Sequence, residues 1–454
     1  MLLKKEILPY NIIEPINERK ENFMHDYTID ILHLNEVRHK IESIETRQEQ
    51  HQLIVELTLI KRNHLCPLCG SEAIKFHSYH YKKIIHSIST HQPCIIRLHH
   101  RKFQCQTCHH VFYEHNPLVD KNENLSLYTK MSILNYLKGY DHTFTDAARH
   151  YYVSIQTVMN LFDTHVEAKP GTLPQVMNID EFFTARVSKY KYACVLYDFI
   201  GKKIIDVLAT RHKRYLINYF SRISMIEKAG VEVVVMDMWK SYREAIKLSF
   251  PKAKIAVDSF HLIRTLNEVI KRIRIDTMNK YRLYKSGPEH DDMYYYMLKK
   301  FHFFFLKNYE DIYDGRIKIH KLNAYWHKSE IMHYLLSIDD ELASAYRLKE
   351  CYREFNLTAD YDTCEDELNQ LINAFRNHQN ASMRTFGRTL INWKNEIINS
   401  FLIYDGRRIS NGPIESVNNK IKTIIKTANG IKKFTRLRNR IMYNINKDIP
   451  IRNI

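Results

Sequence analysis

Two aspartates stand in sequence contexts that suit metal-dependent chemistry. Asp180 ends a predicted strand at residues 175–180, and Asp237 follows the apolar run 231–236, which is typical of a central strand buried on both faces. An anion at the tip of such a strand is costly unless it is paired or bound to a metal. The alternative role for each aspartate is a helix cap or a turn residue. Because side chains alternate across a strand, only one of Asp180 and Glu181 can face the site.

A third carboxylate, Glu415, follows Pro413, which suits the first position of a helix. In the first helical turn, a glutamate can also serve only to stabilise the helix N-terminus. Two divalent ions about 4 Å apart need oxygen ligands, so that one activates an attacking water or 3′-hydroxyl and the other stabilises the leaving oxygen. Asp180, Asp237 and Glu415 are therefore predicted to be catalytic and to hold two Mg²⁺ or Mn²⁺ ions. Asp258 also ends a predicted strand and is interpreted as a supporting or capping residue.

Four of the eight cysteines form two CxxC pairs with the thiolate spacing of zinc knuckles. The predicted ligands of one structural Zn²⁺ are Cys66, Cys69, Cys105 and Cys108. Two unrelated pairs of buried thiols are the alternative. The 35 residues between the pairs exceed the usual spacing and predict a small sheet inserted between the knuckles. Cys94, within that stretch, is interpreted as a buried apolar residue.

The charge balance favours a polyanionic partner. The 68 Lys and Arg exceed the 51 Asp and Glu by 17, which indicates nucleic acid bound through counterion release, although charge can also simply keep a protein soluble. Between the cysteine pairs, the residues that suit phosphate contacts are Lys75, Lys82, Lys83, Arg97, Arg101 and Lys102. After Glu415, a basic segment predicts DNA contacts by Lys422, Lys426, Lys432, Lys433 and Arg436. A solvated helix face is the alternative for that segment.

Residues 146–159 have the pattern of two short helices. Ala147 and Ala148 are small enough for close packing, and Ser154 can N-cap the second helix. As a helix-turn-helix, the second helix would present three predicted DNA contacts, Gln156, Thr157 and Asn160. An ordinary αα-hairpin is the alternative, because the pattern is not specific.

Strand and helix signals predict a multidomain α+β protein. Residues 175–258 follow the order β-β-β-α-β-α-β, with strands at 175–180, 190–197, 203–208, 232–236 and 255–257, which is the order expected for an RNase H-like α/β core. Residues 259–403 are helical in period and too long for a loop, which predicts a helical insertion in that core. The expected divisions are 1–62 (no assigned role), 63–120 (zinc-binding), 121–170 (helix-turn-helix), 171–264 (first part of the core), 265–405 (insertion) and 406–454 (last part of the core, with Glu415 and a basic helix).

Taken together, these features resemble the ISL-three family of bacterial insertion-sequence transposases. The resemblance covers about residues 60–445 and rests on the cysteine pairs, the helix-turn-helix pattern and the motifs Asn-Ile-Asp180-Glu, Val-Met-Asp237-Met, Val-Asp258-Ser-Phe-His261 and Ser-Asn-Gly-Pro-Ile-Glu415-Ser-Val-Asn. It implies a DDE site of Asp180, Asp237 and Glu415 on an RNase H-like fold interrupted by a helical insertion. Ser416 stands where the family usually has glycine, and a serine still permits a helix.

The resemblance also implies partners and a reaction. The N-terminal modules would bind terminal inverted repeats, and the core would cleave a phosphodiester and join the freed 3′-hydroxyl to target DNA. Pairing of two ends implies a homodimer. Asn418 and Lys422 follow Glu415 by one and two helical turns on one face, and we expect them to contact the scissile phosphate or flanking DNA.

Two other functions fit parts of the sequence. One is a DNA-binding regulator built on the zinc and helix-turn-helix modules without catalysis, and an intact carboxylate triad weighs against it. The other is a general nuclease of the RNase H superfamily, which would lack end-specific binding. No run approaches the roughly 18 apolar residues of a membrane span, and the start lacks an export signal, so we expect a soluble, cytoplasmic protein that associates with the nucleoid when bound to DNA.

Overall fold

The computed structural model describes residues 26–87, 92–184, 189–282, 289–312, 315–427 and 431–452. The chain forms two compact units. Unit 1 comprises Met1–Ala168, Lys426–Gly430 and Lys447–Ile454, and unit 2 comprises Lys169–Ile425 and Ile431–Asn446. Part of the N-terminal region expected at residues 1–62 lies outside the described residues.

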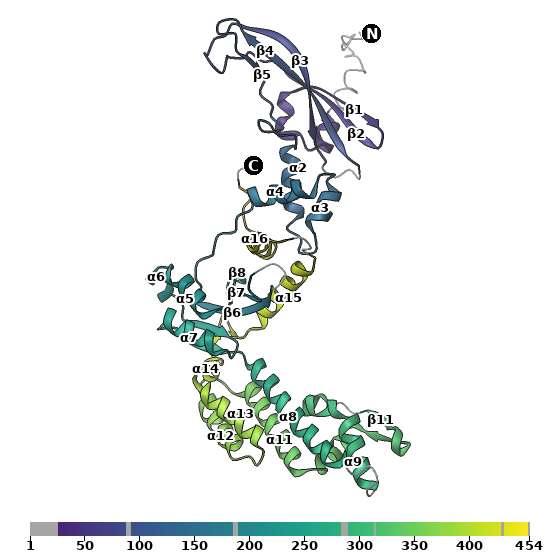
Figure 1. Cartoon of the computed structure of the whole chain (residues 1–454), viewed down its shortest axis with the longest axis vertical. Coiled ribbons are helices and arrows are strands. Elements are labelled where there is room, and N and C mark those ends of the chain that lie inside the picture. The colour runs from purple at the N-terminus through teal and green to yellow at the C-terminus, as the bar shows by residue number, and fades with distance from the viewer. Residues whose placement is uncertain are drawn as a thin grey trace, which may run out of the picture. The chain divides into compact units, whose positions relative to one another are not determined.

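A five-stranded sheet forms much of unit 1 (Figure 1). Its strands are β1 (Ile41–Glu49), β2 (Gln52–Leu59), β3 (Ile74–Ile85), β4 (Cys94–Cys105) and β5 (Val111–Tyr113). The order is β1-β2-β4-β3, with β5 paired to β4. The antiparallel pair β3 and β4 is the sheet predicted between the knuckles. Because β2 pairs with β4 in parallel, the division expected at residue 62 is wrong and falls inside one sheet.

One face of this sheet is apolar and forms a core. Alternate residues of the strands point into it, among them Leu57, Ile84 and Leu98. Cys94 is fully buried in the same core, and burial raises the pKa of its thiol to about 12. This confirms Cys94 as a small apolar residue.

Three helices follow the sheet in unit 1. They are α2 (Leu127–Tyr136), α3 (Phe144–His150) and α4 (Ile155–His165), and a 3₁₀ turn, η1 (Asn35–Lys40), precedes β1. Ser154 caps α4 as predicted, since its side chain accepts a hydrogen bond from the Thr157 amide at 3.0 Å. Ala147 and Ala148 are buried. The two helices predicted over residues 146–159 are thus present.

Unit 2 contains a second five-stranded sheet in the order β10-β9-β6-β7-β8. The strands are β6 (Val176–Phe183), β7 (Tyr192–Asp198), β8 (Lys203–Leu208), β9 (Val233–Met236) and β10 (Lys254–Val257). β6, β7 and β8 form the expected antiparallel meander, and β9 and β10 are parallel to β6. The helices between the strands are α5 (Lys213–Ser221), α6 (Met225–Ala229) and α7 (Lys240–Ser249). β6 continues to Phe183, so Asp180 lies inside this strand and the prediction that it ends the strand is wrong.

Helices dominate the chain between β10 and residue 402. They are α8 (Ser259–Arg282), α9 (Glu289–Lys300), α10 (Lys328–Ser337), α11 (Asp340–Thr358), α12 (Cys364–Arg376), α13 (Ala381–Asn392) and α14 (Lys394–Asn399), with a hairpin of β11 (Arg316–Ile319) and β12 (Ala324–His327). Three short 3₁₀ turns accompany them, η2 (His302–Leu306), η3 (Tyr309–Asp311) and η4 (His320–Leu322). One apolar cluster joins Val234 of the sheet, Leu266 of α8 and Phe375 of α12. The helical region therefore shares a core with the sheet.

The chain then returns to the sheet of unit 2. The last elements are β13 (Ile403–Tyr404), β14 (Arg407–Arg408), α15 (Gly412–Thr427) and α16 (Phe434–Ile445). Asn446, after α16, exchanges hydrogen bonds of 2.8 and 2.7 Å with the backbone of Ile204, which fixes this end of the helix to β8. None of the described helices has the length and apolar composition needed to cross a bilayer.

Candidate active site and cysteine cluster

Strand register brings three aspartates into one row. Ile179 of β6 pairs with Met236 of β9, and Met236 pairs with Val257 of β10. The next residues along these three parallel strands are Asp180, Asp237 and Asp258. Neighbouring strands lie about 4.8 Å apart. The three carboxylates therefore begin from adjacent positions, where β9 and β10 end beside the middle of β6.

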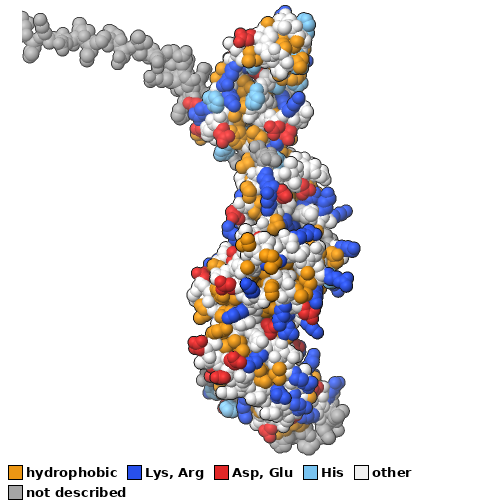
Figure 2. All heavy atoms as spheres, turned by 90° about the vertical axis from the view of Figure 1, so that its left-hand side faces the viewer, with side chains coloured by type: hydrophobic (Ala, Val, Ile, Leu, Met, Phe, Trp, Pro, Cys, Tyr) orange, Lys and Arg blue, Asp and Glu red, His pale blue; other side chains and the backbone are white. Residues whose placement is uncertain are grey.

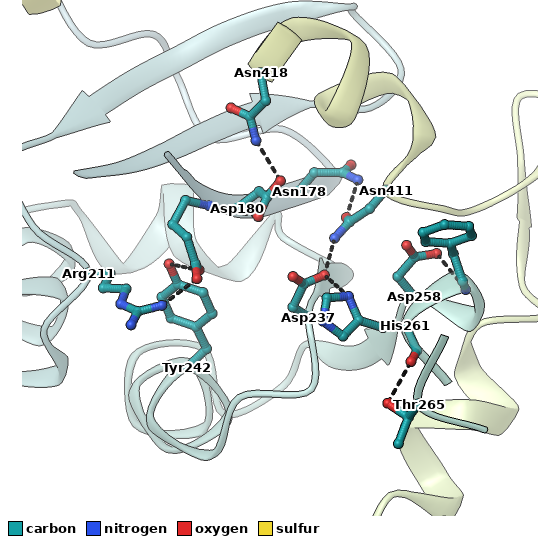
Figure 3. A network of polar contacts seen from close by, with 12 residues as sticks. Asn178, Asp180, Arg211, Asp237, Tyr242, Asp258, His261, Thr265, Asn411 and Asn418 are labelled. Atoms are coloured by element: carbon teal, nitrogen blue, oxygen red, sulfur yellow. Dashed lines mark hydrogen bonds and ion pairs between the residues drawn. The ribbon is translucent and has the colours of Figure 1, made fainter. Parts of the chain in front are cut away.

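Asp180 and Glu181 point to opposite faces, as predicted. Glu181 accepts a hydrogen bond from the Tyr242 hydroxyl at 3.1 Å and pairs with Arg211 (Figure 3). Asp180 accepts from the Glu181 amide at 2.7 Å and from the Asn418 side chain at 2.5 Å. Burial, and then the charge of Asp237, raise the pKa of Asp180 to about 7. The Asp180 carboxylate is therefore partly dehydrated, and its pKa responds to the charge of Asp237.

Asp237 is held by two neutral or weakly basic groups. Its Oδ1 accepts from Asn411 Nδ2 at 3.2 Å and lies 3.3 Å from His261 Nδ1. The hydrogen bond with Asp237 raises the pKa of His261. The motif around His261 was part of the family resemblance, but neither His261 nor Asn411 was predicted as a site residue. Asn411 is the second residue of the Ser-Asn-Gly motif, and its place in this motif is the only signal in the sequence that points to Asn411.

Asp258 combines a capping contact with a position beside the other carboxylates. It is 4% exposed and accepts from the Phe260 amide at the start of α8 at 3.4 Å. Burial is the main cause that raises its pKa to about 6; the charges of Asp237 and Glu415 act in the same direction, and the hydrogen bond from the Phe260 amide opposes them. Glu415 is exposed in the first turn of α15, and its charge is one of the causes of the raised pKa of Asp258. Asp258 matches its interpretation as a capping residue.

The carboxylates gather at one strand edge without closing into a compact cluster. Among the described residues, only the four paired cysteines bring three or more such ligand atoms within 4.8 Å of one another. The donor set nonetheless fits a hard divalent cation, because carboxylate and amide oxygens are its usual ligands. In addition, the buried Oδ1 atoms of Asn178 and Asn418 have no hydrogen-bond partner among the described residues. Asp180, Asp237 and Glu415 are the residues that could hold such ions.

Removing the Asp180 charge is expected to stabilise the metal-free protein at neutral pH. Its pKa is raised from 3.8 to about 7, so the folded state keeps a proton that the unfolded chain releases in this range. The contribution of Asp180 to the free energy of unfolding therefore falls as pH rises from about 4 to about 7. Without divalent ions, Asp180→Asn should melt above wild type at about pH 8, with a smaller difference at about pH 4. An equal or lower melting temperature at the higher pH would contradict this origin of the shift.

The paired cysteines form a tight cluster that could bind zinc. The Sγ atoms of Cys66 and Cys108 are 3.5 Å apart, those of Cys69 and Cys105 are 3.6 Å apart, and all four lie within 4.8 Å of one another. Each second cysteine is followed by a residue with positive φ, Gly70 at 73° and His109 at 60°. The two knuckles therefore have the same turn geometry. No histidine belongs to this cluster.

Backbone amides favour the thiolate form of one cysteine in this cluster. Hydrogen bonds from the amides of Cys108 and Thr107 lower the pKa of the Cys105 thiol to about 6, against the opposing effect of burial, whereas burial and the neighbouring thiols raise the pKa values of Cys69 and Cys108. A thiolate, not a thiol, is the metal ligand. The four soft donors match the tetrahedral S4 set of a structural zinc site.

Several of the predicted DNA contacts lie on the surface. Gln156 and Asn160 are exposed on α4 and hydrogen-bonded to each other at 2.6 Å, while Thr157 is half-buried. The exposed lysines of the C-terminal segment are Lys422, Lys426, Lys432 and Lys433. Figure 2 shows that Lys and Arg side chains are widespread on the face it displays and gather along its right-hand edge.

Other predicted contacts are corrected by burial and pairing. Arg436 is 8% exposed in α16 and does not belong to an exposed basic surface. Arg101 is buried and paired with Glu114 at 3.0 Å, and Arg97 pairs with Glu49 at 3.0 Å. Asn418 is 4% exposed and donates to Asp180 rather than facing solvent. In these cases the side chain is buried or already paired within the protein.

Comparisons with known proteins agree on the family. The family model DDE_Tnp_ISL3, described as "Transposase", matches residues 177–441, which is more than half of the 454 residues. The transposase for insertion sequence element IS1001 of Bordetella parapertussis is 21% identical over 223 residues, 48% of this chain. The chain spans about half the length of that relative, 54%. The chain belongs to the ISL3 family of transposases.

Proposed function

We propose that this chain is a DDE transposase that binds the terminal inverted repeats of an insertion sequence, cuts a DNA strand at each end and joins the freed end to target DNA. The observation that carries the proposal is the placement of Asp180 and Asp237 on adjacent parallel strands, with both aspartates hydrogen-bonded to the segment that carries Glu415. The meander followed by parallel strands in unit 2 supports an RNase H-like core.

In this proposal, Asp180, Asp237 and Glu415 bind two Mg²⁺ or Mn²⁺ ions, which supply activation of the attacking oxygen and stabilisation of the leaving oxygen. Burial and the charge of Asp237 disfavour the charged form of Asp180, and a bound cation would offset both effects. Lys422, exposed two turns after Glu415, would bind a phosphate near the scissile bond and orient the strand. The Asp258 carboxylate would fix the start of α8, from which His261 reaches Asp237.

Unit 1 supplies the proposed end recognition. We propose that α3 and α4 act as a helix-turn-helix, with Gln156 and Asn160 at base edges, and that a zinc ion in the cysteine cluster fixes the knuckles that close the β3–β4 pair. Exposed amides are suited to read base edges because they both donate and accept hydrogen bonds. Two ends must be paired for joining, so the working form is proposed to be a homodimer.

Loss of the exposed amides on α4 should weaken sequence-specific binding. Gln156→Ala or Asn160→Ala should cost about 1–3 kcal/mol for end DNA and little for scrambled DNA of equal length. Dissociation constants measured at one salt concentration would give both values. Gln370→Ala, which changes an exposed glutamine on α12, is the matched control. Equal losses on both DNAs would assign these residues to phosphate contacts instead.

The proposed function is tested through Glu415. We expect wild type with Mg²⁺ to release a 3′-hydroxyl at the repeat terminus of a labelled linear DNA and to join it to a second duplex. Glu415→Gln should bind the same DNA and yield neither product, while Ser416→Ala, a change at the exposed neighbouring position, should yield both. Normal cleavage by Glu415→Gln would remove Glu415 from the site. Cleavage that ignores the repeats would favour a general nuclease.

A further inference from the structure

Two asparagines on either side of Glu415 touch the aspartates directly. Asn411 donates to Asp237 Oδ1 at 3.2 Å, and Asn418 donates to Asp180 Oδ2 at 2.5 Å (Figure 3). Asn411 is 1% exposed and Asn418 is 4% exposed. Because water has little access to these amides, their hydrogen bonds hold the carboxylates in fixed rotamers.

A third asparagine fixes the direction of the Asn411 amide. Asn178, which is fully buried in β6, donates to Asn411 Oδ1 at 2.9 Å and to the Ser410 carbonyl at 2.8 Å. With its oxygen occupied by Asn178, Asn411 must present its NH₂ group to Asp237. The order Asn178, Asn411, Asp237 is therefore a directed chain of hydrogen bonds from the core to the carboxylate.

The amides orient the carboxylates without neutralising them. Among the described residues, neither Asp180 nor Asp237 forms an ion pair with a lysine or arginine, and His261 is the one titratable base at Asp237. A carboxylate accepts about four hydrogen bonds, so lone pairs stay available for a cation after these contacts are made. Asn411 and His261 both contact Oδ1 of Asp237. Neutral donors suit a cation site because they do not compete for its charge.

We propose that Asn411 and Asn418 are positioning residues that hold Asp237 and Asp180 in the orientation that binds divalent metal. This inference rests on the proposed function. It gives Asn418 a role on the metal site in place of the DNA contact expected from its position on the helix. Asn411 and Asn418 flank Glu415 in the chain. When the segment around the start of α15 packs against the sheet, the same segment therefore supplies Glu415 and orients Asp180 and Asp237.

Direct metal binding tests this inference without relying on catalysis. The full-length, zinc-loaded protein without DNA would be titrated with Mn²⁺, and free Mn²⁺ followed by electron paramagnetic resonance. Asn411→Ala and Asn418→Ala should weaken Mn²⁺ binding by about 10–100-fold, the usual effect of losing a group that orients a ligand. Asn419→Ala, at the exposed neighbouring position, should bind as wild type does. Strand cleavage by the two variants should recover at higher Mn²⁺ concentration.

The outcomes separate this inference from the proposed function. If Asp237→Asn weakens Mn²⁺ binding but Asn411→Ala and Asn418→Ala do not, the positioning role is wrong while the metal site stands. If wild type and Asp237→Asn bind Mn²⁺ equally, the metal site itself fails and the positioning role fails with it. Should an alanine variant unfold, Asn411→Ser or Asn418→Ser keeps a polar group that is too short to reach the carboxylate. The serine variants should show the same loss of Mn²⁺ binding, and wild-type affinity in them would overturn the inference.

Discussion

Asp237→Asn should abolish strand cleavage and leave DNA-end binding unchanged. The substitution preserves the shape of the side chain and an oxygen that can accept from Asn411 and face His261, as Asp237 Oδ1 does. What it removes is a negative charge in the centre of the row formed by Asp180, Asp237 and Asp258. Without that charge, we expect cleavage to fall by about 100–1,000-fold, the order of effect seen when one preorganised group is lost.

The fold should tolerate this substitution. The charge of Asp237 is one cause of the raised pKa of Asp180, so its removal relieves repulsion, and the metal-free variant should melt no lower than wild type. Cleavage at the ends, binding by gel shift and thermal unfolding would be measured on the same preparations. Asp366→Asn, a change at an exposed position of α12, is the matched control and should cleave normally. Parallel loss of binding and cleavage in Asp237→Asn would argue against a catalytic role.

Removal of zinc should eliminate end-specific binding. Four thiol groups within 4.8 Å cannot all be deprotonated without a cation to offset their charges. In structural zinc sites, metal binding supplies folding free energy, so chelation should disorder the two knuckles. We expect affinity for end DNA to fall at least about ten-fold, which is about 1.4 kcal/mol.

The effect should be local to unit 1. The apolar core of its sheet is built from residues such as Leu57 and Ile96, which lie outside both knuckles. Cys105→Ser should therefore reproduce the binding loss with most β structure retained, while Cys351→Ser, at an exposed cysteine of α11, should have no effect. Zinc content by mass spectrometry and end affinity would be measured together. A zinc-free protein with wild-type end affinity would contradict a role of this cluster in recognition.

Local patterns were sufficient to predict the elements that position the site. The strands of the five-stranded sheet in unit 2 occur where apolar runs and turns predicted them, and the aspartates after β9 and β10 follow from those runs. The CxxC pairs predicted the cysteine cluster, because the spacing of such ligands is local. Each of these features depends on residues close together in the chain.

Contacts between residues that are far apart in the sequence could not be predicted from local patterns. Asn418 meets Asp180 across 238 positions, and Asn411 meets Asp237 across 174, so no local periodicity reports either contact. Basic residues were misassigned for a related reason. A lysine or arginine in a basic stretch is predicted to be exposed. In the structure, however, Arg101 is buried against Glu114 and Arg436 is buried in α16. Composition indicates the sign of the charge on a protein surface, whereas the burial of one basic side chain depends on the residues that pack against it in the folded protein.

Metal-dependent cleavage of specific DNA ends by this protein can be measured directly. The most direct measurement incubates the zinc-loaded protein and Mg²⁺ with linear DNA carrying the inverted repeats that flank its gene, and maps each cut to the nucleotide. We expect cuts at the repeat termini with wild type and Mg²⁺, and none with Asp237→Asn or with a chelator of Mg²⁺. Binding of those ends by wild type without any cut would contradict the account and favour a DNA-binding regulator.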